Sequence, residues 1–270
     1  MNRIRDIVVV NHRLDPISTE LHVHIKLDAI TPTTALKGRL IGPRSMHATT
    51  IEIAYPLHEI ERSDHIVLRA VIPESSWWEP RSPFLYEGPL ELWQDDVLCD
   101  RATIRHGIRA LQLTSKGLRL NGKPLVVRGK LVHGSLSEQD AIALRDAGFS
   151  ACWLIGASNI DPWNSADRVG LFLLGSCFDV TEFFALHSEL TSHASHFGWI
   201  FNRNDLSQAP LLQPGFGMLY GINTSARSIP ENSDFMVCTQ DELAWLEEVD
   251  MPRIVVAKKL ADPLLQRAKV

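Results

Sequence analysis

The clearest hydrophobic pattern lies near the N-terminus, where apolar and polar residues alternate strictly over residues 19–28. Leu21, Val23, Ile25 and Leu27 have one parity, and polar or charged side chains have the other. A period of two is typical of an antiparallel strand with one face on a core and one in solvent. Similar runs recur at residues 4–10, 35–40, 49–54, 65–72, 85–93 and 97–104. About seven short strands separated by turn-forming stretches predict an immunoglobulin-like β-sandwich over residues 1–113.

The pattern changes after about residue 113, where short apolar runs alternate with stretches of helical character. Asn121-Gly122 first predicts a tight hairpin turn between residues 118–120 and a strand at residues 125–127. Six further buried strands are then predicted at residues 151–155, 171–174, 197–201, 218–222, 235–238 and 253–257. Repeated strand-then-helix units imply parallel strands, and about seven strands in this half fit a barrel better than a flat sheet. Because such barrels typically need about 250 residues, residues 114–270 are predicted to form a shortened (β/α) TIM-type barrel.

Two helices in this half carry terminal signals. Ser137 followed by Asp140 is close to a capping box. Asp161-Pro162 predicts a second helix with Asp161 as its cap, and Gly170 is expected to end it. Further helices are predicted at residues 182–193, 240–248 and 262–269. The chain is therefore expected to be multidomain, β first and α/β second.

Composition narrows the class of protein. The chain has 270 residues, a formal net charge of −5, 45% hydrophobic and 22% charged residues. This profile is globular, and the mild acidity argues against a nucleic-acid partner. No apolar run approaches the roughly 18 residues that span a bilayer, and no signal peptide is recognised, so a cytoplasmic location is expected. The cysteines at positions 99, 152, 177 and 238 form no C-x-x-C pair, which fits buried free thiols in a reducing compartment.

Metal and cofactor motifs are weak. His22 and His24 share one face of a predicted strand, but no third ligand is identifiable, so solvated histidines are the favoured interpretation. His187, His193 and His196 are better explained as a helix end and a loop. No Gly-rich nucleotide motif, phosphate loop or zinc-protease motif occurs. We therefore expect neither a metal nor a cofactor.

Several segments match, in order, motifs of one enzyme family. They are Trp-Trp-Glu-Pro-Arg-Ser-Pro-Phe-Leu-Tyr at 77–86, His-Gly-Ile-Arg at 106–109, Leu-Arg-Leu-Asn-Gly-Lys-Pro at 118–124, Asp-Ala-Ile-Ala-Leu-Arg-Asp-Ala-Gly-Phe at 140–149 and Asp-Arg-Val-Gly-Leu at 167–171. In combination they resemble glycoside hydrolase family 2, the β-galactosidase, β-glucuronidase and β-mannosidase group. The resemblance implies a sandwich followed by a barrel. We do not expect the family's usual N-terminal jelly-roll domain within residues 1–270.

The resemblance also implies a retaining mechanism that needs two carboxyl groups about 5 Å apart. The family's acid/base glutamate follows the fourth barrel strand. Here His193, Ser195 and Trp199 align with the segment that precedes it, which places Asn204 at the glutamate position. A one-residue insertion would place Asp205 there instead. Neither alignment supplies glutamate. Asn204 and Asp205 are therefore the two candidates for the residue at the acid/base position.

Other positions implied by the resemblance have also changed. The nucleophile should be a glutamate ending the seventh strand, but the sequence there reads Ala257-Lys258-Lys259, and the nucleophile is unidentified. After the first strand, where the family has Asn, His and an acid, only His133 is retained. Losing several such positions while the buried pattern persists points to a scaffold that no longer runs the reaction.

Three functions are compatible with these residues. The first is a catalytically inactive family-2-like protein, a carbohydrate-binding or assembly module, with His133, Trp153 and Trp199 as substrate contacts and Trp163 nearby. The second is an active β-glycosidase with a rearranged site, using Asp205 with Glu182 or Glu242. The third is a different enzyme with His133 as its base. An incomplete barrel would leave a strand edge to cover, which predicts a homodimer.

Overall fold

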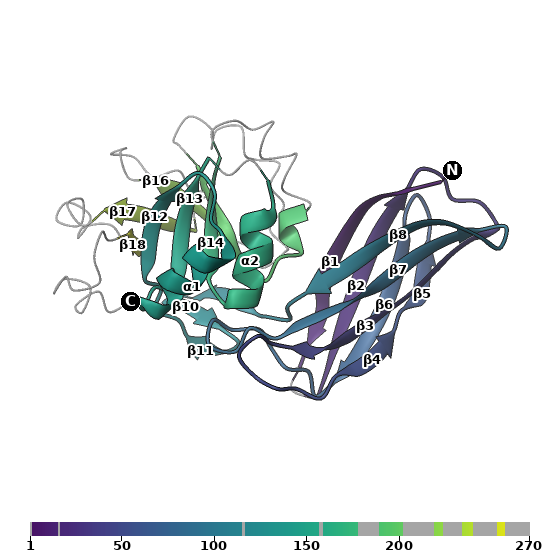
Figure 1. Ribbon diagram of the computed structural model, residues 1–270, viewed down its shortest axis with the longest axis horizontal. Helices are drawn as coiled ribbons and strands as arrows, with labels where there is room; N and C mark the ends of the chain where they lie inside the picture. The colour runs from purple at the N-terminus through teal and green to yellow at the C-terminus, as the bar shows by residue number, and fades with distance from the viewer. Residues whose placement is uncertain are drawn as a thin grey trace. The chain divides into compact units, whose positions relative to one another are not determined.

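The computed structural model divides the chain into two compact units (Figure 1). It describes residues 2–15, 17–114, 117–156, 159–177, 189–201, 219–223, 234–239 and 253–256. The first unit comprises Met1–Arg109 with Ser188–Ala194, and the second comprises Ala110–His187 with Ser195–Val270. The sequence-based domain boundary after residue 113 stays a prediction.

The first unit is built from two antiparallel sheets. Its strands are β1 (Ile4–Leu14), β2 (Ser18–Leu27), β3 (Thr34–Arg44), β4 (Ile53–Pro56), β5 (His58–Arg62), β6 (Ile66–Pro73), β7 (Leu85–Gln94) and β8 (Val97–His106). One sheet has the order β1-β2-β6-β5 and the other has the order β4-β3-β7-β8. The inner faces of both sheets supply one apolar core, so the unit is a β-sandwich.

Strand β2 shows why the alternation in sequence produces this layer. Leu21, Val23 and Ile25 are completely buried, whereas the intervening polar residues are partly exposed. The core partners of these three residues include Leu40 of β3 and Leu90 of β7, from the opposite sheet. Each fully buried side chain of this size contributes about 1.5–3 kcal/mol. The predicted alternation over residues 19–28 is therefore confirmed.

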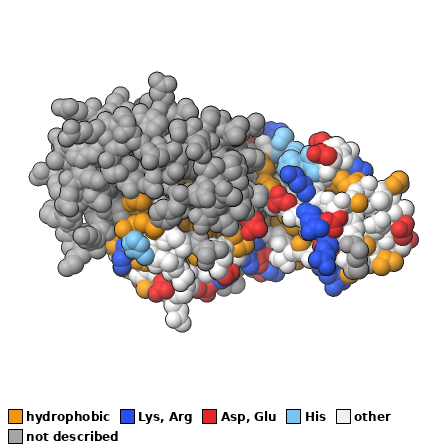
Figure 2. Space-filling model, turned by 90° about the horizontal axis from the view of Figure 1, so that it is seen from above, with side chains coloured by type: hydrophobic (Ala, Val, Ile, Leu, Met, Phe, Trp, Pro, Cys, Tyr) orange, Lys and Arg blue, Asp and Glu red, His pale blue; other side chains and the backbone are white. Residues whose placement is uncertain are grey.

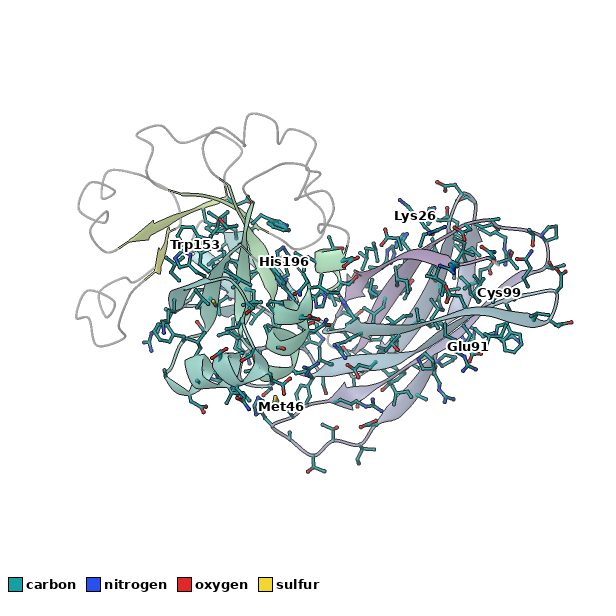
Figure 3. The ribbon with its side chains drawn as sticks, turned by 45° about the horizontal axis from the view of Figure 1, so that its top comes forward. Lys26, Met46, Glu91, Cys99, Trp153 and His196 are labelled. Carbon is teal, nitrogen blue, oxygen red and sulfur yellow. The ribbon has the colours of Figure 1, made fainter. Side chains whose placement is uncertain are left out.

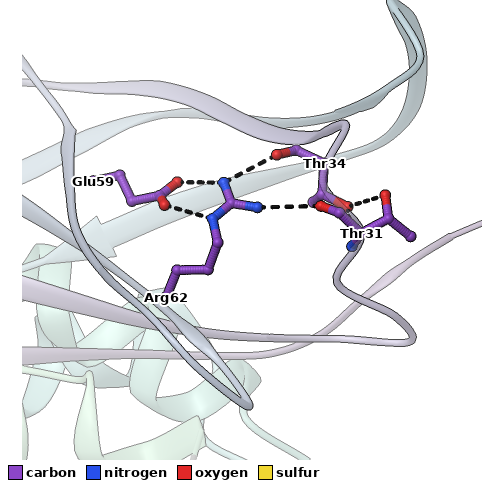
Figure 4. A network of polar contacts seen from close by, with 4 residues as sticks. All are labelled: Thr31, Thr34, Glu59 and Arg62. Carbon is purple, nitrogen blue, oxygen red and sulfur yellow. Dashed lines mark hydrogen bonds and ion pairs between the residues drawn. The ribbon is translucent and has the colours of Figure 1, made fainter.

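Strand β5 was not predicted from the sequence. All five of its residues are exposed, so no alternation in hydrophobicity marks it. Its last residue is held by side-chain hydrogen bonds: Arg62 Nε donates to Glu59 Oε1 at 2.7 Å, and Arg62 Nη2 donates to the Thr34 carbonyl at 3.0 Å (Figure 4). This edge strand is thus fixed by one guanidinium that bonds to both sheets of the sandwich.

The second unit begins with a small antiparallel sheet of β9 (Leu111–Thr114), β10 (Gly117–Leu120) and β11 (Lys123–Pro124). Asn121 and Gly122 connect β10 to β11 with φ values of 52° and 77°. Positive φ at both central residues is the requirement of a type I′ turn, which Asn-Gly meets at low cost. The predicted Asn-Gly turn is confirmed, but the predicted second strand at residues 125–127 was wrong, because β10 pairs with Lys123–Pro124 and residues 125–128 form no strand.

Seven described parallel strands then close into a barrel. They are β12 (Gly129–His133), β13 (Ala151–Ile155), β14 (Phe172–Cys177), β15 (His196–Phe201), β16 (Leu219–Asn223), β17 (Phe235–Thr239) and β18 (Arg253–Val256). Closure is made by the pairing of Gly129 in β12 with Val256 in β18. The open edge expected of an incomplete barrel is therefore paired, and the homodimer stays a prediction that this edge does not support.

Helix α1 (Glu138–Asp146) follows β12 and begins as predicted. The Ser137 side chain accepts from the backbone N–H of Asp140 at 3.2 Å, and Asp140 Oδ2 accepts from the backbone N–H of Ser137 at 3.3 Å. These reciprocal bonds form a capping box, which satisfies two donors that the first helical turn leaves open.

Helix α2 (Asp161–Val169) follows β13, and its predicted cap was wrong. Ile160 is the N-cap residue, and Asp161 is already helical. The backbone N–H of Asp161 donates to Asn159 Oδ1 at 3.2 Å, so the side chain of Asn159 provides the acceptor for this N–H of the first helical turn. Gly170 ends the helix with φ of 83°, as predicted.

The remaining predicted helices fall largely outside the described residues. Of the helix predicted at 182–193, the structure describes residues 189–193, and residues 189–191 are helical. The segments 240–248 and 262–269 lie outside the described residues. Within the described part of the chain, no helix is both long enough and apolar enough to cross a membrane.

Candidate functional site

His133 is the last residue of β12 and is exposed. The carboxyl ends of parallel barrel strands lie together at one end of the barrel, where functional side chains gather. The backbone N–H of Gly134 donates to the carbonyl of Ile155 at the end of β13, at 2.9 Å. His133 is therefore held at this end of the barrel by a bond that joins two neighbouring strand ends.

Trp153 and Trp199 lie within strands β13 and β15 rather than at their ends. Trp153 is 7% exposed and Trp199 is 3% exposed. The Trp199 ring packs over Gly175 so closely that a Cβ on Gly175 would lie 2.9 Å from it. Stacking on a sugar requires an open aromatic face, and neither tryptophan presents one. The structure therefore places these two predicted substrate contacts in the core and leaves only His133 accessible.

Trp153 nevertheless retains one unused polar atom. Its Nε1 is buried and has no hydrogen-bond partner within the described part of the chain. In register, Trp153 lies between Leu131 of β12 and Leu174 of β14, and Figure 3 shows it among the barrel strands. Buried indole N–H groups usually find a partner, so this donor is a polar feature inside an otherwise apolar stretch of the barrel.

The predicted acid/base residues cannot be placed. Asn204 and Asp205 lie outside the described residues, as do Glu182 and Glu242. Strand β15 ends at Phe201, so Asn204 and Asp205 follow its end by three and four residues. Their sequence position after the fourth barrel strand is the position that the family resemblance requires, and their geometry stays a prediction.

The described barrel strands carry no carboxyl group. None of the strands β12 to β18 contains Asp or Glu in its sequence. Strand β18 is the seventh of them, and the residues after it are Ala257-Lys258-Lys259. The carboxyl group expected of a nucleophile at the end of the seventh strand is therefore missing from that position in the sequence.

Three described carboxylates near the barrel strands have structural partners. Asp140 belongs to the α1 capping box, and its hydrogen bonds from Ser137 lower the pKa of this carboxyl. Glu138 accepts from Arg168 Nε of α2 at 2.9 Å. Asp167 of α2 accepts from the backbone N–H of Ser195 at 2.7 Å. Their roles are helix capping, helix pairing and backbone support.

Asp167 belongs to a buried polar cluster. The Ser195 hydroxyl donates to the Trp163 carbonyl at 3.3 Å, and Trp163 Nε1 donates to His196 Nδ1 at 3.1 Å. His196 is completely buried at the start of β15 (Figure 3), which corrects its assignment to a loop. The His196 ring also packs edge-on against Trp199. This cluster joins two segments that resemble family motifs, one containing Asp167 and one containing Ser195. Because these side chains are buried, their role is to hold the two segments together.

One surface cavity of about 320 Å³ lies between β12 and α1. It is lined by Lys130, Val132, Ser135, Leu136, Asp140, Ala143, Leu144, Ala147 and Phe149. Asp140 is its one carboxylate and is engaged in the capping box. Since a retaining glycosidase needs two facing carboxyl groups, this cavity does not have the chemistry of that site.

A histidine cluster in the first unit contains His22 but differs from the His22–His24 pair considered from the sequence. The side chains of His12, Glu20 and His22 bring three potential ligand atoms within 4.8 Å of one another. Figure 2 shows histidine side chains gathered on one face of this unit beside charged ones. The neighbour that the sequence alone did not identify is His12, which comes from the adjacent strand at a register irregularity.

Comparison with known proteins gives the class of the fold. No family profile matches the chain. The solved structures that it resembles are family 2 glycosyl hydrolases and related β-glycosidases, with identities too low to show more than the fold. The chain is therefore glycoside hydrolase family 2-like in fold.

Particular relatives can be named. The family 2 member from Bacteroides cellulosilyticus has 19% identity and a TM-score of 0.64, covering 94% of this chain and 40% of that one. A β-glycosidase from Bacteroides vulgatus has 17% identity and a TM-score of 0.68, covering 94% and 38%. A β-galactosidase from Klebsiella pneumoniae strain 342 is 26% identical over 129 residues, 43% of this chain and 12% of its own length. The chain thus spans only a small part of the curated relatives that it matches.

Proposed function

We propose that the two units are an immunoglobulin-like sandwich and a shortened TIM-type barrel. The order β1-β2-β6-β5 against β4-β3-β7-β8 corresponds to the immunoglobulin arrangement of two sheets with one added edge strand. The backbone N–H of Ser76 donates to Tyr86 Oη at 2.9 Å, similar to the tyrosine corner of such sandwiches. Seven described parallel strands, with helices after the first two, support a (β/α) barrel.

The proposed function is that of a family-2-like protein without glycosidase catalysis, acting as a carbohydrate-binding or assembly module. One observation carries this proposal: the seventh described barrel strand leads into Ala257-Lys258-Lys259, and none of the strands β12 to β18 contains a carboxylate. A retaining mechanism forms a covalent bond between the sugar and a carboxylate. A lysine side chain in that position cannot replace it, because it is protonated at neutral pH.

The acid/base position supports the same proposal. Asn204 cannot donate a proton at a useful pH, and an aspartate at this position would hold its carboxyl about one C–C bond further back than glutamate. Misplacement by about 1 Å can cost about a hundredfold in rate. Binding does not need either group, and His133 remains exposed at the carboxyl end of the strands, where it can contact a sugar hydroxyl.

The test is an activity assay beside a binding assay. Purified chain is incubated with aryl β-galactoside, β-glucuronide and β-mannoside, together with the variants Asp205→Ala and Asp146→Ala. Asp146 is an exposed α1 carboxylate and serves as the matched control. We expect background turnover in all three proteins. Turnover in the unmodified chain that Asp205→Ala abolishes and Asp146→Ala preserves would instead establish an active glycosidase with a rearranged site.

The binding half of the proposal is tested on a sugar array. We expect retention of at least one β-linked glycan class, weakened in His133→Ala and unchanged in His47→Ala, an exposed histidine of the sandwich. Absence of retention across the array would exclude the carbohydrate role and leave the assembly role. That role predicts a protein partner, to be identified by cross-linking of the intact chain.

A further inference from the structure

The outer face of the sheet that contains β1 and β2 carries a line of histidines. The rings of His12 and His22 stack with centroids 3.9 Å apart and an interplanar angle of 9°. His22 Nε2 lies 2.9 Å from Glu20 Oε1. Further along, His24 Nδ1 lies 3.4 Å from His65 Nε2, and His65 Nδ1 lies 2.8 Å from Asp64 Oδ1. Imidazoles and carboxylates are thus concentrated on one surface of the sandwich.

The backbone explains how His12 reaches this group. Residues Asn11 and Arg13 of β1 pair with Leu21 and Glu20 of β2, and the register shifts between them, leaving His12 as the extra residue. A bulge of this kind re-aims a side chain relative to the regular alternation. His12 therefore stacks on His22. Glu20 lies two residues before His22 in β2, so the two side chains are on the same face of that strand.

The ligand types and spacing suit a transition-metal ion. Two imidazoles and one carboxylate are nitrogen and oxygen donors that zinc accepts. Ligand atoms about 2.0–2.2 Å from one Zn²⁺ lie roughly 3–3.5 Å apart. The Glu20–His22 contact of 2.9 Å is already near that spacing. His12 is exposed, so its side chain can rotate. Rotation can move its ring nitrogen the roughly 1 Å closer to the other two ligand atoms that a shared Zn²⁺ requires.

The charges around the cluster favour a bound cation when the histidines are neutral. Glu20 supplies a carboxylate beside the two rings. The opposing group is Arg69 of β6, whose Nε lies 4.0 Å from Glu20 Oε1. The Arg69 side chain is 46% exposed, so it can turn into solvent when a metal takes its place.

From these observations we propose that His12, Glu20 and His22 form a binding site for one zinc-class divalent transition-metal ion. The ion takes the place of the proton shared by His22 Nε2 and Glu20 Oε1, and water completes its coordination. Hard cations such as Mg²⁺ are excluded, because they require mostly oxygen ligands. The site lies entirely within the sandwich and does not depend on what the barrel does.

The experiment is Zn²⁺ titration by isothermal calorimetry on the full chain without a histidine tag. We expect one ion per chain with micromolar or tighter affinity near pH 7.5, and no binding of Mg²⁺. His12→Ala, Glu20→Gln and His22→Ala should each weaken Zn²⁺ at least about tenfold, since even outer-shell partners matter on this scale. His47→Ala is the matched histidine control, and His24→Ala tests the neighbouring ring; both should bind normally. Thermal unfolding of the metal-free variants verifies that they are folded.

Co²⁺ distinguishes this site from the cysteines. A thiolate ligand gives Co²⁺ an intense near-ultraviolet charge-transfer band, whereas imidazole and carboxylate ligands do not. We expect only weak visible bands, lost in His22→Ala. Absence of Zn²⁺ binding, affinity unchanged in His12→Ala and His22→Ala, or a thiolate band that accounts for the bound ion would each overturn the proposal.

Discussion

Asp167 Oδ1, in helix α2, accepts a hydrogen bond of 2.7 Å from the backbone N–H of Ser195, the residue directly before β15. Both residues are buried, with Asp167 2% exposed and Ser195 fully enclosed. The bond connects two segments that the family resemblance marks but that lie 28 positions apart. It holds the entrance of the fourth barrel strand against the helix that follows the second.

Removal of this acceptor is expected to destabilise the second unit. Asp167→Leu leaves the buried N–H of Ser195 without its side-chain acceptor and should lower the free energy of unfolding by about 1–3 kcal/mol. Asp167→Asn keeps an acceptor oxygen and should cost less. Urea-induced unfolding measures both, with exposed Asp146→Asn as the control. Equal stability of Asp167→Leu and the unmodified chain would show that the bond is not needed.

Tyr86 at the start of β7 provides a second test, in the sandwich. It is 1% exposed, burial raises its pKa to about 12, and its hydroxyl oxygen accepts from the backbone N–H of Ser76. Tyr86→Phe removes that acceptor and should reduce the free energy of unfolding by about 1–2 kcal/mol. Tyr55→Phe is the matched control, because Tyr55 packs edge-on against Tyr86 at 6.1 Å and is less buried. A larger loss in Tyr55→Phe than in Tyr86→Phe would contradict the assignment.

Acidification should destabilise the sandwich through His24 and Glu20. Burial, followed by the charges of His65 and His22, lowers the pKa of His24 below its ordinary value of 6.5. The unfolded chain then binds the proton more readily, so stability is full above pH 6.5 and declines as pH falls toward the folded pKa. Glu20, whose pKa is lowered from 4.5 by its hydrogen bond to His22, contributes stability above pH 4.5 that is lost on further acidification.

The measurement is the urea midpoint between about pH 7 and pH 5, where His24 dominates. His24→Gln should flatten the decline over this range, and His47→Gln should leave it unchanged. The titration is done in the presence of a chelator, so that bound metal does not contribute. A decline of the same steepness in His24→Gln would assign the effect to other groups.

Regular patterns made much of the fold predictable. Strand β2 alternates because one face lies on the core, and the Ser137–Asp140 capping box depends only on residues three apart. Strand β5 escaped prediction because it is an exposed edge strand whose position is fixed by Arg62 and by pairing with β6. The cap of α2 was misassigned because Asn159, one residue before the N-cap, provides the acceptor.

The candidate sites were harder to predict for a different physical reason. A single extra residue in β1 brings His12 beside His22. The alternation of apolar and polar residues does not predict where such a bulge occurs. Trp153 and Trp199 are compatible in sequence with either a sugar contact or a core role, and in the structure both are buried. Whether aromatic side chains face a ligand or a core depends on long-range packing, which the local sequence does not determine.

The cysteines give a final prediction about chemical reactivity. Cys152 in β13 is fully buried, and burial raises the pKa of its thiol to about 12, whereas Cys99 in β8 is partly exposed. Only the thiolate reacts with iodoacetamide, so the raised pKa of the Cys152 thiol lowers its reactive fraction, and burial blocks access of the reagent as well. In the native protein Cys99 should be alkylated before Cys152, and Cys152 only after denaturation. Peptide mapping by mass spectrometry reads each position separately, and equal rates in urea serve as the control. Labelling of native Cys152 as fast as Cys99 would mean that β13 opens to solvent far more readily than a closed barrel permits.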